Sequence, residues 1–94
     1  MLSKTLAREF GGKIRVNALA PGYIKTDMTA QSFNDEKINK QRSASSILQR
    51  WGESSDLVGA ALFLSSSDAS FITGHELCID GGWRSNGLPY WEML

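Results

Sequence analysis

The sequence predicts an α/β fold in which two parallel strands form one flank of a doubly wound parallel sheet. Two short, mostly apolar segments, residues 14–20 and 75–80, are bounded by glycines and a proline, as buried strands are. An apolar helical segment, residues 57–64, lies between them along the chain. A strand–helix–strand unit implies a parallel pair with a right-handed crossover.

A helix is predicted from Leu2 to Phe10, because Leu2, Leu6 and Phe10 recur every four residues and form an apolar face. Gly11 and Gly12 are expected to end it, since glycine adopts the left-handed cap conformation at little cost. No capping residue precedes the helix in this sequence. It therefore has the pattern expected for the last part of a longer helix.

The first strand is expected to stop pairing at Pro21, which has no N–H to donate. Ligands of open α/β sheets bind beyond the carboxyl ends of the strands, so the turn after this strand is the expected binding region. The connection that follows, residues 22–53, is unusually long for a compact domain and is typical of a lid or binding loop. Residues 35–50 within it are predicted to form a helix. Its expected apolar contacts are Ile38, Ile47 and Leu48.

The second helix of the unit is predicted to begin at a cap formed by Ser54 or Ser55. It is apolar on nearly all sides, so one face can lie on a sheet while the other needs a second partner. Its apolar residues are Leu57, Val58, Ala60, Ala61, Leu62, Phe63 and Leu64.

The polar residues 65–70 are expected to form a turn, after which Gly74 opens the second strand. Leu77 and Ile79 lie on one face of that strand. Two strands with both edges unpaired do not make a closed core, so residues 1–94 are expected to be one part of a larger domain. The remaining strands are expected either to have been lost or to lie on another chain.

Composition excludes several classes of protein. The 94 residues are 41% hydrophobic and 21% charged, as in a globular chain, and ten basic residues balance ten acidic ones. We therefore expect no nucleic-acid partner and no membrane-surface partner. No apolar run approaches the roughly 20 residues that cross a bilayer, and the N-terminus lacks the apolar core of a signal peptide. An intracellular, cytoplasmic location is expected, which the single Cys78 fits weakly.

Several polar residues have a structural interpretation that we favour. Asn17, in the middle of a strand, is expected to bond a neighbouring segment rather than to take part in catalysis. His75 is the only histidine, and no Cys/His cluster predicts a metal site. Cys78 is expected to be a small buried apolar residue. Basic residues of the connection are predicted to form a solvated helix face. They are Lys37, Lys40 and Arg42.

Four segments in succession resemble the C-terminal part of a short-chain dehydrogenase/reductase. They are residues 6–10 (LAREF), 14–26 (IRVNALAPGYIKT), 50–53 (RWGE) and 74–82 (GHELCIDGG). The resemblance implies a Rossmann sheet, of which this chain would hold the last two strands. It also implies hydride transfer between NAD(H) or NADP(H) and an alcohol or carbonyl carbon. The sequence does not distinguish NAD from NADP.

The resemblance implies cofactor roles for the turn after the first strand. Pro21 and Gly22 would lie beneath the nicotinamide ring, where glycine permits close backbone approach. Ile24 would bond the carboxamide through its backbone, and the Thr26 hydroxyl would reach the carboxamide or the pyrophosphate. Without the resemblance, Thr26 would be expected to bond its own backbone.

Three lid residues have two interpretations that the sequence leaves equally open. Tyr23, Met28 and Phe33 either contact the substrate or pack the lid against the body. The segments TDMT (26–29), RWG (50–52) and DGGW (80–83) are most similar to the branch acting on 2-deoxy-gluconate and gluconate. A sugar acid or polyol is therefore the favoured substrate. A 3-oxoacyl-carrier-protein reductase is the alternative.

The family's catalytic residues have no match in these 94 residues. The glycine-rich phosphate turn, the catalytic serine and the Tyr-x-x-x-Lys motif would lie upstream of Met1, so we assign no catalytic residue, and Tyr23 and Tyr90 are not substitutes. The chain by itself is expected to be inactive. A different interpretation is a non-enzymatic remnant that binds full-length subunits, and a third is an independent small binding module.

Oligomers are also implied by the resemblance. Members of the family commonly form tetramers through the last strand and the preceding helix, here the one from Leu57 to Leu64. The aromatic, irregular tail from Trp83 onward is expected to dock on a neighbouring subunit.

Overall fold

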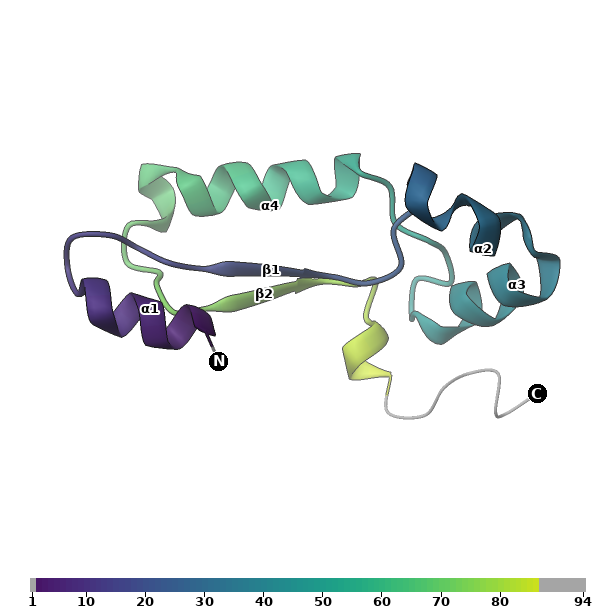
Figure 1. The fold of residues 1–94 in the computed structure, drawn as a ribbon, viewed down its shortest axis with the longest axis horizontal. Coiled ribbons are helices and arrows are strands. Elements are labelled where there is room, and N and C mark those ends of the chain that lie inside the picture. The colour runs from purple at the N-terminus through teal and green to yellow at the C-terminus, as the bar shows by residue number, and fades with distance from the viewer. Residues whose placement is uncertain (1, 87–94) are drawn as a thin grey trace.

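A computed structural model describes residues 2–86 of the chain. The helices and strands are α1 (Leu2–Phe10), β1 (Ala18–Pro21), α2 (Ala30–Asn34), α3 (Glu36–Ser45), α4 (Ser55–Ser65) and β2 (Glu76–Ile79). Short 3-10 turns occur at Asp27–Thr29, Ser67–Ala69 and Trp83–Ser85. Figure 1 shows α4 along one side of the two strands, α1 on the other side, and α2 and α3 beyond the strands' carboxyl ends. The predicted order of helix, strand, lid, helix and strand is confirmed.

β1 and β2 pair in parallel, as the strand–helix–strand order predicts. The register runs from Ala18 opposite Glu76 to Pro21 opposite Ile79. Pairing stops at Pro21, as predicted, and the N–H of Gly22 closes this last pair by donating to the Ile79 carbonyl at 3.1 Å. In a parallel ladder the residue after the proline can supply that donor, so the missing N–H of Pro21 interrupts nothing.

The first strand begins four residues later than predicted, because side chains replace the backbone ladder before Ala18. The N–H of Val16 donates to the Thr73 hydroxyl at 3.1 Å. Asn17 donates through its side-chain amide to the Ile72 carbonyl at 3.1 Å and accepts from the His75 N–H at 3.0 Å. The structural role predicted for Asn17 is confirmed, since it joins the segments that lead into both strands.

The predicted ends of the helices are partly right. α1 has the predicted bounds, and Gly11 follows it with a φ of +58°. α4 begins at the expected position, but Ser54 makes no side-chain capping bond. The Asp56 carboxylate reaches back instead and accepts from the Glu53 N–H at 2.7 Å. An acceptor in the first turn thus bonds the N–H just before the cap, whereas a capping serine would accept from an N–H inside the first turn.

The lid segment differs most from the prediction. The helix expected over residues 35–50 ends at Ser45, and the short α2 before it was not predicted. Asp35 caps α3 by accepting from the Ile38 N–H at 3.1 Å. Ile47 and Leu48 lie beyond the helix and are more than half exposed. The chain turns there because the Leu48 N–H donates to the Gly81 carbonyl, which joins the lid to the end of β2.

The interior is small. Among residues 2–86 the buried apolar side chains are those of Ala7, Trp51 and Ala69. β2 is only half-buried along its length, and so is Cys78, so the prediction of a buried cysteine is wrong. The reason is that no further strand flanks β1 or β2 in the described part of the chain. Large exposed apolar residues on and near α4 are Val58, Leu62, Phe63 and Phe71.

The described helices are short. None of them within residues 2–86 has both the length and the apolar composition needed to cross a bilayer. The tail beyond Asn86, including Tyr90 and Trp91, lies outside the described residues, as does Met1.

Candidate functional site

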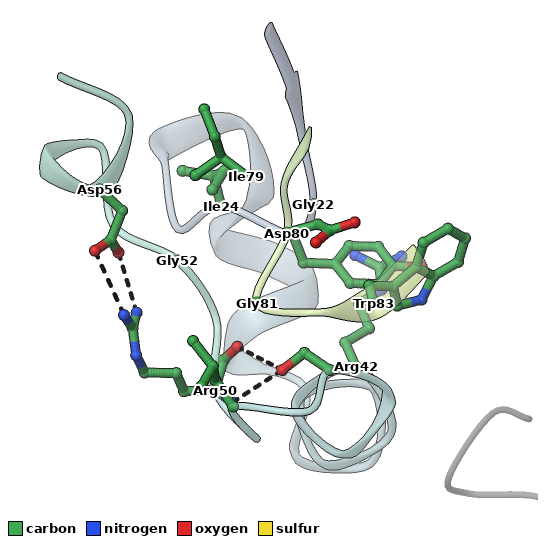
Figure 2. A pocket seen from close by; sticks show the side chains of 13 residues that line it. Gly22, Ile24, Arg42, Arg50, Gly52, Asp56, Ile79, Asp80, Gly81 and Trp83 are labelled. Carbon is green, nitrogen blue, oxygen red and sulfur yellow. Dashed lines mark hydrogen bonds and ion pairs between the residues drawn. The ribbon is translucent and has the colours of Figure 1, made fainter. Parts of the chain in front are cut away.

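A cavity of about 160 Å³ lies at the carboxyl ends of β1 and β2, between the strands and the lid (Figure 2). This is the edge where open α/β sheets bind ligands. The residues that line it come from the two strand ends, α3, the segment before α4 and the turn after β2. They are Gly22, Tyr23, Ile24, Arg42, Ser46, Leu48, Arg50, Gly52, Asp56, Ile79, Asp80, Gly81 and Trp83.

The two strand ends approach closely at Gly22. A Cβ atom at this position would stand 2.9 Å from both the Cα and the Cβ of Asp80. Real Cβ atoms do not come so close to a backbone carbon, so only glycine fits without a shift of the chain. Gly22 therefore keeps the backbone after β1 against the backbone after β2.

Asp80 fixes the turn that closes this side of the cavity. Its two carboxylate oxygens accept from the N–H groups of Gly82, at 3.0 Å, and Arg84, at 3.1 Å. Gly81 and Gly82 have φ values of +62° and +88°, which favour glycine. The carboxylate is thus held at the cavity wall with both oxygens already engaged.

A second pair of segments meets at Ile24 and Gly52. The Lys25 N–H donates to the Gly52 carbonyl and the Gly52 N–H donates to the Tyr23 carbonyl, both at 2.8 Å. The carbonyl of Ile24 accepts from the Thr29 hydroxyl at 2.7 Å. No group within residues 2–86 accepts from the Ile24 N–H, which is left free for a ligand.

Thr26 lies on the surface just outside the cavity. Its N–H donates to the Thr29 hydroxyl at 2.8 Å, and the two threonine hydroxyls are 3.4 Å apart. Thr29 therefore organises the loop from Ile24 to Thr26 by bonding both ends. The sequence motif TDMT contains this threonine, but its role was not predicted.

Aromatic rings pack the lid against the body. The rings of Tyr23 and Phe33 lie 5.7 Å and 5.4 Å from the ring of Trp51, which is buried. Lys25 places its ammonium 4.3 Å from the centre of the Phe33 ring. Of the two interpretations of Tyr23 and Phe33, these contacts favour packing, while Tyr23 also lines the cavity.

Arg42 does not lie on a solvated face, so that prediction is wrong for it. Its guanidinium carbon lies 4.6 Å from the centre of the Tyr23 ring and 5.6 Å from that of Trp51. Stacking on the two rings draws the side chain inward, away from Lys37 and Lys40, which are exposed. Arg42 thereby becomes part of the cavity wall.

Arg50 and Asp56 form an ion pair at the mouth of the cavity, with guanidinium nitrogens 3.0 Å and 3.4 Å from the two carboxylate oxygens. Figure 2 shows this two-point contact. The hydrogen bond from Arg50, together with that from the Glu53 N–H, holds the pKa of Asp56 below its ordinary value. The same hydrogen bond raises the pKa of Arg50.

The cavity brings together three of the residues singled out from the sequence, Gly22, Tyr23 and Ile24. Pro21 is the last residue of β1 and lies next to the cavity without lining it. Met28 is 96% exposed and lines no part of it. Residues 2–86 contain no cluster of three or more His, Cys, Asp or Glu side chains that could hold a metal ion.

Sequence reasoning missed Arg42, Asp80 and Trp83 as cavity residues. Asp80 could have been found, because it directly follows a strand at the binding edge and precedes two glycines. Nothing in the sequence distinguished Arg42 from the other basic residues of its helix. Its position depends on the rings of Tyr23 and Trp51, which approach it only in the folded chain.

The sequence and fold were compared with those of known proteins. Residues 1–84 match a family model described as enoyl-(acyl carrier protein) reductase. The 2-dehydro-3-deoxy-D-gluconate 5-dehydrogenase of Bacillus subtilis is 42% identical over 85 residues, which are 89% of this chain and 34% of that protein.

Solved structures of dehydrogenases are also similar to this chain in fold and sequence. A gluconate 5-dehydrogenase from Burkholderia cenocepacia in complex with NADP and tartrate superposes with a TM-score of 0.83 at 34% identity, over 90% of this chain and 34% of that one. A mutant 4-hydroxyisoleucine dehydrogenase in complex with NADH and succinate gives a TM-score of 0.85 at 38% identity, over 89% of this chain and 35% of that one.

The chain belongs to the short-chain dehydrogenase/reductase family. The resemblance to its gluconate-dehydrogenase-like branch and the Rossmann-type α/β fold expected from the sequence are both confirmed. The chain spans about a third of the length of the relatives it matches.

Proposed function

We propose that these 94 residues form the nicotinamide- and substrate-binding flank of an NAD(P)-dependent oxidoreductase that acts on a sugar acid. The observation that carries the proposal is the cavity at the carboxyl ends of β1 and β2, bordered by the Pro21–Gly22 turn. By this proposal, residues 1–94 are one part of a Rossmann domain.

The cofactor-binding residues we propose are Pro21, Gly22, Ile24 and Thr26. The glycine allows backbone approach at the strand end, where no side chain fits. The unpartnered N–H of Ile24 suits the carbonyl oxygen of a carboxamide. The exposed hydroxyl of Thr26 contacts the Thr29 hydroxyl at 3.4 Å and can also bond a ligand that lies along the loop. Both NADP and NADH occur in related structures, so either nucleotide is proposed.

A sugar acid is favoured over an acyl thioester by the names of the relatives. The B. subtilis and B. cenocepacia proteins are dehydrogenases of gluconate or its derivatives, whereas the family model's description names an acyl-carrier-protein reductase. The cavity wall also carries the charged side chains of two arginines and two aspartates, which can bond the hydroxyl and carboxyl groups of a sugar acid.

Hydride transfer also needs a proton donor or acceptor at the reacting oxygen, and general acid–base help is worth roughly 10²–10⁴-fold in rate. No residue of this sequence matches the tyrosine–lysine pair of the family. We therefore expect the 94 residues by themselves to give no turnover of NAD(P)H, and measurable turnover by the purified chain would contradict this expectation.

The experiment that tests the proposal is a chimera. Residues 2–86 replace the matching C-terminal segment of the B. subtilis relative, which supplies the rest of the domain. The proposal predicts a protein that oxidises or reduces a gluconate derivative with NAD(P). The chimera carrying Gly22→Ala should bind the nucleotide more weakly than the unaltered chimera. A folded chimera with no nucleotide binding would refute the proposal.

A second candidate function is association with other subunits, without catalysis. It is favoured by the exposed apolar residues Val58, Leu62 and Phe63 of α4, which a neighbouring subunit could cover. The oligomer we propose, a tetramer, would use α4 and β2. Leu62→Lys should then shift the sedimentation of the chain toward the monomer, while Lys37→Gln on α3 leaves it unchanged. Identical sedimentation of the Leu62 variant would argue against this interface.

A further inference from the structure

We propose that Arg42 binds the carboxylate of the substrate and so selects a sugar acid over a neutral polyol. This inference rests on the proposed function, because it concerns the same cavity. It begins from the charges that line the cavity wall, which belong to Arg42, Arg50, Asp56 and Asp80.

Three of these four charges are already engaged. Arg50 and Asp56 contact each other at 3.0 Å and 3.4 Å. Asp80 accepts one backbone hydrogen bond at each carboxylate oxygen. Arg42 is different, because within residues 2–86 no carboxylate lies at ion-pairing distance from it and no acceptor takes a hydrogen bond from its guanidinium. The cavity therefore has one cation with no partner of opposite charge.

The guanidinium of Arg42 is fixed in place. Its carbon lies 4.6 Å from the centre of the Tyr23 ring and 5.6 Å from that of Trp51, so cation–π attraction holds the guanidinium against both rings. Figure 2 shows the side chain rising from α3 toward the strand ends. A guanidinium has five N–H groups, and none of those of Arg42 donates to a group within residues 2–86, so these donors are available to a ligand.

This arrangement suits a carboxylate. Two parallel N–H groups of a guanidinium match the two oxygens of a carboxylate, and a charge-assisted pair is about twice as strong as a neutral hydrogen bond. Tyr23, on which Arg42 stacks, directly follows Gly22 in the proposed nicotinamide turn. A carboxylate bound by Arg42 would thus belong to a molecule that extends toward the reacting end of the cofactor. The fixed Asp80 carboxylate repels an anion, which leaves the side of Arg42 as the acid-binding end.

The test uses the 94-residue chain and two probes, D-gluconate and the neutral polyol D-sorbitol. Binding is followed through the NMR shifts of the Gly22 and Tyr23 amides. We expect the chain to bind gluconate more tightly than sorbitol. Arg42→Gln should weaken gluconate binding by about tenfold to a hundredfold and leave sorbitol binding unchanged. Arg42→Lys should keep part of the preference, because it keeps the charge but loses the two-point fork.

The matched control is Lys37→Gln, which removes the same charge from the exposed face of α3 and should behave as the unaltered chain does. Equal gluconate binding by the Arg42→Gln variant, or equal binding of the two probes by the unaltered chain, would overturn the proposal.

A second measurement does not depend on how stable the isolated chain is. In the chimera described above, Arg42→Gln should raise KM for gluconate with little change in kcat, because Arg42 holds a part of the substrate that does not react. A chimera that turns over gluconate equally well with Gln at position 42 would refute the role of Arg42 alone. A chimera that binds no nucleotide would refute the proposed function instead.

Discussion

Gly22 and Asp80 lie so close that a single methyl group on Gly22 would stand 2.9 Å from the backbone of Asp80. The two residues directly follow β1 and β2, so their contact fixes how the two strand ends sit at the floor of the cavity. Asp80 cannot retreat easily, because its carboxylate is bonded to the N–H groups of Gly82 and Arg84.

Gly22→Ala is therefore expected to destabilise the chain by about 1–3 kcal/mol, the usual cost of forcing an extra carbon into a packed site. The measurement is denaturant unfolding of the chain and its variant. Gly59→Ala is the matched control, because a Cβ at Gly59 meets nothing within 4 Å and alanine favours α4 by roughly 0.5–1 kcal/mol. Equal stability of the two variants would mean that the strand ends separate freely.

The sequence predicts the regular part of this fold well, for physical reasons that are local. The apolar spacing of Leu2, Leu6 and Phe10 and the glycine after them determine α1 without help from the rest of the chain. Bounded apolar runs likewise locate β1, α4 and β2. Pro21 marks the end of the pairing as predicted, although its missing N–H removes no bond, because Gly22 supplies the last donor.

The lid and the cavity could not be predicted in the same way, because distant segments determine them. α3 ends at Ser45, before the predicted Arg50. Three residues later the Leu48 N–H donates to the carbonyl of Gly81, which is 33 residues further along the chain. Arg42 enters the cavity wall only because Tyr23 and Trp51 provide rings to cover. Met28 lies in the loop predicted to contact a ligand, and nothing in the loop sequence indicates that its side chain faces solvent.

Asn17 joins the approaches to both strands, through one donated and one accepted bond to backbone groups near residue 73. Asn17→Ala removes both partners and leaves the His75 N–H and the Ile72 carbonyl without them. We expect a loss of about 1–3 kcal/mol in unfolding free energy, as for other polar groups that lose a partner. Asn34→Ala, at an exposed position, should stay within about 0.5 kcal/mol. An equally small loss of unfolding free energy in the Asn17→Ala variant would show that water replaces the side chain as the partner of the Ile72 carbonyl and the His75 N–H.

Trp51 is buried, and its indole N–H makes no hydrogen bond within residues 2–86. Its side chain is 6% exposed. Trp51→Ala should cost about 3–5 kcal/mol, as removal of a buried aromatic ring does. Trp51→Phe keeps a ring between Tyr23 and Phe33, leaves a smaller cavity and removes the unpaired donor, so its cost should be clearly below that of Trp51→Ala. If phenylalanine is as harmful as alanine in thermal unfolding, the indole N–H has a partner in solution.

Asp56 should make the stability of the chain depend on pH. Its bonds to Arg50 and to the Glu53 N–H lower its pKa in the folded chain relative to the ordinary value of 3.8. A carboxyl with a lowered folded pKa stabilises the fold above its unfolded pKa, and this contribution disappears as pH falls through the folded pKa. Asp56→Asn keeps an acceptor for the Glu53 N–H but loses the charge. The Tm of the variant should thus be lower than that of the unaltered chain at pH 6, and the two Tm values should converge below pH 3.8.

Added salt should narrow the difference in Tm at pH 6, because the Arg50–Asp56 pair is exposed to solvent. A difference in Tm that stays constant from pH 6 to pH 2 would mean that the oxygen's geometry, rather than the carboxylate's charge, stabilises the start of α4.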